Sequence, residues 1–151
     1  MKEILFNLIR KHNYDISIYS SEIFERRCQE EIIRSDEDKT SFVYVEFDLE
    51  AVKSKLQSEE CTLLFWEIFL AALNKSCRAD DVLGMLENDS GIGMLILDSK
   101  EDGWNRIKGR IHQAAQTQGY LLMDQILNLA HPIVYPSCIQ NSNLDSASAK
   151  Q

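Results

Sequence analysis

The sequence predicts an α/β protein in which a mixed, mostly antiparallel sheet is flanked by helices. Two short apolar runs, 82–86 and 92–97, flank the turn-forming cluster 87–91, a pattern typical of a β-hairpin. A third run, 42–48, is rich in β-branched and aromatic residues and indicates another strand. Segments with apolar residues three or four positions apart separate these strands, and this order favours a sheet covered by helices.

Length, composition and charge restrict the class of protein. The 151 residues, 44% hydrophobic and 26% charged, suit one domain with its own core. A net charge of −8 argues against binding to nucleic acid or to anionic membranes, because both require a basic face. No apolar run approaches the roughly 20 residues of a membrane span, and the N-terminus lacks a secretory signal. We therefore expect a cytoplasmic protein.

The cysteines and histidines do not indicate a metal site. The four cysteines are scattered, with no CxxC pair and no histidine spaced to complete a zinc site. In a reducing compartment they are expected to be free thiols. We therefore expect neither a bound metal nor a cofactor.

Two helices are expected before the first strand. Residues 1–12 have an amphipathic pattern, and we expect the segment 1–19 to be an N-terminal helix or linker. Ser20 or Ser21 can cap a second helix over 22–35. The expected apolar side of this helix consists of Ile23, Phe24, Cys28, Ile32 and Ile33.

The middle of the chain continues with a strand and a buried helix. Residues 35–39 are expected to form a polar break. The strand 42–48 alternates imperfectly, which indicates burial on both faces near the centre of the sheet. The segment 62–76 is apolar around nearly its whole circumference, and such a helix is usually buried against a sheet.

The C-terminal part predicts a further helix and a final strand. Residues 100–116 have helical spacing, and 121–127 leaves strand and helix open. Residues 133–135 indicate a strand between two prolines. The expected inward side of the 100–116 helix consists of Trp104, Ile107, Ile111 and Ala115. The domain is expected to span 20–139, followed by a disordered tail over 140–151.

Two groups of charged residues are candidates for chemistry. Asp48 and Glu50 follow the first strand, and carboxylates at a strand end can hold Mg²⁺ together with the phosphates of a nucleotide. A solvated strand end is the simpler interpretation. Arg78 and Asp81 precede the hairpin and can present a guanidinium beside a carboxylate, or form a plain salt bridge or helix cap. No phosphate-binding glycine loop and no Ser/His/Asp grouping is present, so no catalytic residue is assigned.

From about residue 20 to residue 137, the chain resembles a GGDEF domain of the diguanylate cyclase family, in degenerate form. The similar segments are FDLEAVK at 47–53, CRADDVLGML at 77–86 and GMLILD at 93–98. The resemblance implies a βααββαβ order, with Asp48 as the metal-binding aspartate and Lys53 as the lysine of the family. The IVYPS segment resembles members associated with polysaccharide sugar transferases.

The sequence departs from the family at its signature turn. The Gly-Gly-Asp-Glu-Phe turn of the family is replaced by Glu87-Asn88-Asp89-Ser90-Gly91. A glutamate side chain at a former glycine would crowd and repel a triphosphate. The resemblance therefore implies a catalytically inactive regulatory or protein-interaction domain, with Asp48, Glu50 and Lys53 as a vestigial metal and nucleotide site. An active cyclase is the least favoured reading.

A second site of the family retains its pattern. Arg78 and Asp81 form the Arg-x-x-Asp that precedes the turn by five residues and that binds cyclic di-GMP in the family. Arg110 matches a further arginine from the following helix, and Arg106 is the other candidate. The alternative function is therefore a cyclic di-GMP receptor. A protein partner of polysaccharide synthesis or signalling is expected, and a homodimer is left open.

Overall fold

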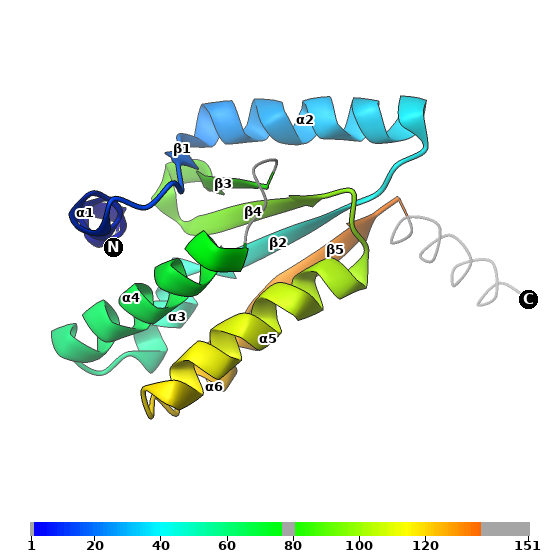
Figure 1. The fold of residues 1–151 in the computed structure, drawn as a ribbon. Coiled ribbons are helices and arrows are strands. Elements are labelled where there is room, and N and C mark those ends of the chain that lie inside the picture. Colours follow the sequence, from blue (N-terminus) through cyan, green and yellow to red (C-terminus); the bar gives the residue numbers. More distant parts are fainter. Residues whose placement is uncertain (1, 77–80, 137–151) are drawn as a thin grey trace, which may run out of the picture.

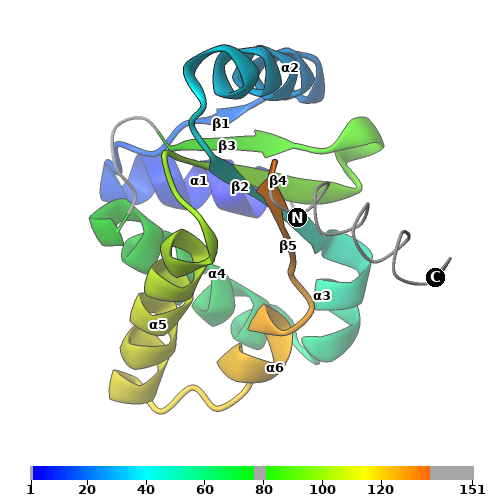
Figure 2. The ribbon, with the colours of Figure 1, turned by 90° about the vertical axis from the view of Figure 1, so that its right-hand side faces the viewer.

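The computed structural model describes residues 2–76 and 81–136, whose strands form one sheet between two layers of helices (Figures 1 and 2). The strands are β1 (Ile18–Tyr19), β2 (Phe42–Asp48), β3 (Val82–Met85), β4 (Gly91–Leu97) and β5 (His131–Tyr135). The helices are α1 (Lys2–His12), α2 (Ser21–Asp38), α3 (Leu49–Lys55), α4 (Glu59–Ser76), α5 (Glu101–Thr117) and α6 (Met123–Leu127).

The sheet has the strand order β1-β3-β4-β2-β5. β1 is parallel to β3, and the other neighbouring pairs are antiparallel. The predicted class and the mostly antiparallel mixed sheet are confirmed. The predicted hairpin is β3 and β4, and β5 is an edge strand, a position that tolerates Pro132. No helix in the described part of the chain is both long and apolar enough to cross a bilayer.

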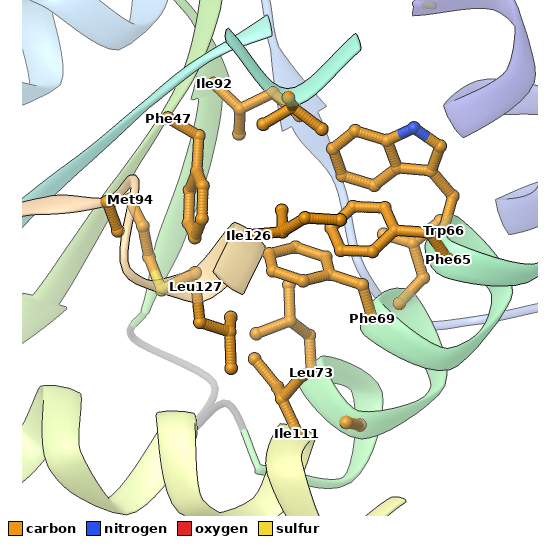
Figure 3. Packing of buried hydrophobic residues seen from close by; sticks show 14 of the residues in the cluster. Phe47, Phe65, Trp66, Phe69, Leu73, Ile92, Met94, Ile111, Ile126 and Leu127 are labelled. Atoms are coloured by element: carbon orange, nitrogen blue, oxygen red, sulfur yellow. The ribbon is translucent and has the colours of Figure 1, made fainter. Parts of the chain in front are cut away.

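The main core lies between the sheet and the layer that contains α4 and α5 (Figures 1 and 3). In Figure 3 Phe47 of β2 points toward the aromatic side chains of α4, and its ring meets that of Phe69 edge-on with centroids 5.4 Å apart. Phe65 and Trp66 form a second edge-on pair at 4.7 Å. The expected buried helix is therefore confirmed, although it begins at Glu59. The inward residues predicted for α5 are also buried.

The N-terminal helix belongs to the same core. The side chains of Leu5 and Leu8 are 0% and 3% exposed, and α1 packs against α4. The Lys2 ammonium lies 3.5 Å from the Asp89 carboxylate of the hairpin turn. β1 adds residues 18–19 to the sheet. The described part of this segment, 2–19, is thus packed with the rest of the fold, whereas the expected tail 140–151 lies outside the described residues.

The prediction for α2 is wrong in its length and in its buried face. The helix is capped by Ser20 as expected, but it continues through Asp38 and ends at Lys39, whose φ of 58° is left-handed. Residues 35–39 are therefore not a break. Of the side chains expected on the apolar side, Phe24 is buried and Cys28 is half-buried. The three isoleucines are instead exposed, by 45% for Ile23, 38% for Ile32 and 57% for Ile33, and the polar residues Glu31 and Ser35 are buried in their place.

An ion-pair network explains why this polar face can be buried. Arg34 lies 2.6 Å from the Glu31 carboxylate and 3.2 Å from the carboxylate of Asp98, which follows β4. A buried carboxylate is tolerated when it is paired and hydrogen-bonded. At the other end of the helix, the ring of Phe24 lies over β3 and β4, where Gly84 and Gly93 face each other. These two anchors set the rotation of α2 and turn its isoleucines outward.

Three elements are not predicted by the sequence patterns. β1 has two residues, which is too short for a periodicity. α3 follows β2 without an intervening loop, and the sequence patterns assigned no element to its seven residues. The ambiguous segment 121–127 forms the short helix α6.

Candidate functional site

Asp48 ends β2 and caps the next helix. Its Oδ1 accepts hydrogen bonds from the backbone N–H of Glu50 at 2.9 Å and of Ala51 at 3.3 Å, which makes it the N-cap of α3. An aspartate followed by an acidic first turn is a helix-start signal that could have revealed α3 from the sequence. The side chains of Asp48, Glu50 and Lys53 are all exposed.

The hairpin turn lies beside Asp48. Asp48 pairs with Gly91 in the β2–β4 register, and the Leu49 N–H donates to the Ser90 carbonyl at 3.0 Å. A Cβ on Gly91 would lie 2.4 Å from the Phe47 carbonyl oxygen, so the close approach of two backbones requires glycine here. The structure therefore brings together Asp48 and the turn.

The turn itself presents polar side chains to solvent. Glu87–Asp89 forms one 3₁₀ turn in which Asn88 and Asp89 adopt left-handed φ values of 57° and 54°. All three side chains are exposed. Among the described residues, no three His, Cys, Asp or Glu side chains converge as a metal site would require. The arrangement offers carboxylates at the surface rather than an assembled metal centre.

The second candidate site lies at the opposite end of β3. The Asp81 carboxylate accepts a hydrogen bond from the Leu97 N–H at 3.2 Å, which fixes it against the end of β4. Arg110 is exposed on α5, and Arg106 is half-buried on the same helix. Arg78 lies outside the described residues. The structure thus places Asp81 but does not test its pairing with Arg78.

Sequence reasoning missed a groove on the α2 face of the sheet. Its volume is about 710 Å³, and it lies between α2, the hairpin turn and the strands β2 and β5. The lining residues are Ser21, Glu22, Phe24, Glu25, Cys28, Ile32, Phe42, Tyr44, Met85, Leu86, Glu87, Asn88, Ile133 and Tyr135. No single segment carries this signal, because the lining comes from four parts of the chain.

Burial affects the titration of two side chains in this groove. Burial raises the pKa of the Cys28 thiol to about 11, so the thiol is protonated at neutral pH. Burial, followed by a hydrogen bond to Glu46, raises the pKa of the Tyr44 phenol. That bond joins Tyr44 Oη to Glu46 Oε2 at 2.8 Å. Cys28 and Tyr44 are therefore neutral at pH 7, beside the three glutamates that also line the groove.

Comparison with solved structures places the fold. A DGC protein from Thermotoga maritima aligns with a TM-score of 0.52 and 16% identity, over 88% of this chain and 95% of that chain. The GGDEF domain of TpbB (YfiN) from Pseudomonas aeruginosa aligns with a TM-score of 0.53 and 14% identity, over 80% and 73% of the two chains. A third match, the diguanylate cyclase SiaD from Pseudomonas aeruginosa in complex with its activator SiaC, has a TM-score of 0.48 and 16% identity, over 74% and 45%.

No protein-family model matches the chain, and no curated protein matches it in sequence. The structural matches span most of the described chain and reproduce the mixed sheet with its flanking helices. The chain therefore has the fold of the GGDEF domains of diguanylate cyclases.

Proposed function

We propose that this chain is a catalytically inactive GGDEF-like domain that regulates by binding a protein partner. The observation that carries the proposal is the turn beside Asp48, where the exposed residues Glu87 and Asn88 stand in place of the two glycines of the family. In the family, that turn lets the backbone approach the nucleotide. Here the side chains occupy that space.

Electrostatics disfavours a nucleotide at this turn. The turn carries the exposed carboxylates of Glu87 and Asp89, and the exposed Asp48 lies beside it. Two like charges 4 Å apart repel by about 1 kcal/mol even in bulk water. Asp89 is partly offset by Lys2, but this exposed pair contributes little. Several such repulsions reduce nucleotide affinity by more than one surface lysine restores.

The test is a turnover assay with GTP and Mg²⁺, with cyclic di-GMP measured by chromatography. We expect no product above a protein-free control, for the intact chain and for Asp48→Asn alike. Mg²⁺-dependent formation of cyclic di-GMP that is lost in Asp48→Asn would overturn the proposal, because the vestigial site would then be a working one.

A cyclic di-GMP receptor is the second candidate. The observation that favours it is Asp81, which the Leu97 N–H holds at the end of β4 at the position of the Arg-x-x-Asp aspartate. Arginine can hold a phosphate or the Hoogsteen edge of guanine, and aspartate can accept from guanine N–H groups. Arg110 of α5 is the proposed additional contact.

Calorimetric titration of cyclic di-GMP tests the receptor function. Arg78→Ala and Arg110→Ala should each abolish or strongly weaken binding, whereas Arg27→Ala, which removes a surface partner of Glu30, should not. Asp81 is left intact because its bond to Leu97 is also structural. Absence of heat with the intact chain at high micromolar concentrations would reject the receptor function and leave the protein-binding one.

The setting of this domain is part of the proposal. The IVYPS segment at the end of β5 supports a partner from polysaccharide synthesis or signalling in the bacterial cytoplasm. Affinity capture from cells, followed by identification of the bound proteins, tests this setting. Light scattering of the purified chain tests whether it forms a homodimer.

A further inference from the structure

One half of the α2 face of the sheet is not covered by a described helix. Strands lie about 4.8 Å apart, and a helix packs with a spacing of about 10 Å, so one helix covers about two strands. α2 contacts β3 and the hairpin turn, and its Phe24 ring lies on Gly84 of β3 and Gly93 of β4. α2 reaches the neighbouring strands β2 and β5 through side chains, with Phe24 stacked on Tyr44 and Asp36 accepting a hydrogen bond from Tyr135, and the groove lies between the helix and these strands. Figure 1 shows α2 on this face and the other layer of helices on the opposite one.

The uncovered strands form the floor of the groove. Phe42 and Tyr44 of β2 are two residues apart and so share a face, as do Ile133 and Tyr135 of β5. Phe42 stacks on Tyr135 with ring centroids 5.2 Å apart. The Tyr135 hydroxyl donates to Asp36 Oδ1 at 2.8 Å, which ties β5 to the end of α2. The groove therefore has a built, aromatic floor and a fixed wall at this end.

Apolar side chains remain exposed along the groove. Ile133 on the floor is 43% exposed, and Ile32 on the α2 wall is 38% exposed. Cys28 and Tyr44 are half-buried between them. Contiguous exposed apolar surface rimmed by polar residues is typical of an interaction site.

The rim of the groove is acidic. Glu22 and Glu25 of α2 and Glu87 of the turn all line it, and none of the described lining residues is Lys, Arg or His. The ion pairs found in the described part of the chain do not involve these three glutamates. Their charge is therefore available to a basic partner, in a chain whose net charge is −8.

From this shape and charge we infer that the groove binds a basic amphipathic helix of a partner protein. The apolar stripe of that helix packs on Tyr44, Ile133 and Ile32, and its lysines or arginines lie against the glutamates of the rim. A helix is favoured over a strand because the open surface is a face of the sheet, and helices pack on faces whereas strands add to edges. The inference rests on the proposed protein-binding function and assigns its surface and the chemistry of the partner.

The test uses synthetic peptides and the full chain. The probe is an 18-residue peptide of leucine and lysine in amphipathic helical spacing, and the control peptide has glutamate at each lysine position. Binding is followed by calorimetry and by two-dimensional NMR of the labelled protein. We expect only the basic peptide to bind, with shift changes centred on the amides around Tyr44 and Ile133.

Two pairs of matched variants separate the groove from general attraction to an acidic protein. Glu22→Gln with Glu25→Gln should weaken binding about five- to tenfold, whereas Glu59→Gln with Glu60→Gln removes the same charge from the first turn of α4 and should change it less than twofold. Ile133→Ser should weaken binding at least tenfold. Leu63→Ser, which alters a side chain with the same 43% exposure on α4, should have no effect.

The inference would be overturned if a groove variant and its matched control weakened peptide binding equally. It would also be overturned if the NMR chemical shift changes fell on the α4 and α5 side of the sheet. A dimer of the peptide-free chain that Ile133→Ser dissociates would overturn it as well, because the occupant would then be a second copy. Binding that requires deletion of 137–151 would assign the groove to the chain's own C-terminal segment and would also overturn it. The proposed function fails by a different result, GTP turnover, so an active cyclase that still binds the basic peptide would leave the groove assignment standing.

Discussion

α2 packs on two facing glycines of the sheet, and this contact leads to a prediction about the free energy of unfolding. Gly84 of β3 pairs with Gly93 of β4, and the Phe24 ring lies on both. Neither glycine has a positive φ, so each is required for space and not for backbone conformation. Alanine at these positions therefore tests chiefly the contact with Phe24 that docks α2, with a looser contact between residue 93 and Leu86 at 3.1 Å.

The expected magnitude follows from the distances. A Cβ on Gly93 would lie 2.3 Å from Cε2 of Phe24, about 1.2 Å inside an ordinary carbon–carbon contact of about 3.5 Å. The ring is 2% exposed and cannot move into solvent. We expect Gly93→Ala to reduce the free energy of unfolding by about 2–3 kcal/mol, the upper range for overpacking. Gly84→Ala should cost at least as much.

A double-mutant cycle with Phe24→Ala distinguishes the two glycines. Phe24→Ala alone should cost about 3–5 kcal/mol. In that background Gly93→Ala should cost less than about 1 kcal/mol, because its clash is with the end of the deleted ring. Gly84→Ala should remain costly, because the Cβ of residue 24 stays 2.4 Å away in either background.

These free energies are obtained from urea unfolding followed by far-ultraviolet circular dichroism. The dependence of the free energy on urea concentration, the m-value, should be the same in every variant compared. Equal costs of Gly93→Ala in the two backgrounds would refute the contact between this glycine and the ring. A smaller cost of Gly84→Ala in the Phe24→Ala background would show that α2 can shift on the sheet and that its position over β3 is not fixed.

Three further predictions follow from single residues. Gly91→Ala should reduce the free energy of unfolding by about 3 kcal/mol or more in urea titration, because its Cβ would meet the backbone oxygen of Phe47, which cannot swing aside; a cost under about 1 kcal/mol would contradict this. Burial raises the pKa of Tyr120 from 10.0 to about 12, so the stabilisation it provides is complete below pH 10 and is lost as the pH rises toward 12. The melting temperature should therefore fall less steeply between pH 10 and 12 in Tyr120→Phe than in the original chain. An unchanged slope would contradict the raised pKa of Tyr120. Burial raises the pKa of Cys28 from 9.0 to about 11 and so lowers its thiolate fraction. Alkylation of Cys28 at pH 8 should therefore be about a hundredfold slower in the native chain than in urea, as measured by mass spectrometry of the peptide that contains it. Equal rates would show that the Cys28 side chain is open to solvent.

Local patterns were sufficient to predict the regular elements that carry strong periodicity. The hairpin, the strand 42–48 and the buried helix of α4 were confirmed, because each depends on short-range spacing of apolar residues and on turn formers at one position. The pairing of Asp48 with Gly91 at the turn was not predicted and is set by the register of β2 and β4. Arg78 stays a prediction, since it lies outside the described residues.

Orientation and long-range contacts were decided by the tertiary structure alone. Periodicity favoured an inward face of α2 that includes its isoleucines. The isoleucines face outward instead, because Phe24 packs on two glycines of the sheet and Glu31 is buried in an ion pair with Arg34. Glu31 and Arg34 are three residues apart on one helix, but no local pattern reports that Asp98, 64 residues from Arg34, completes the ion-pair network that allows the Glu31 carboxylate to be buried. The acidic, apolar groove arises in the same way, from residues on α2, β2, β5 and the turn that meet only when the chain is folded.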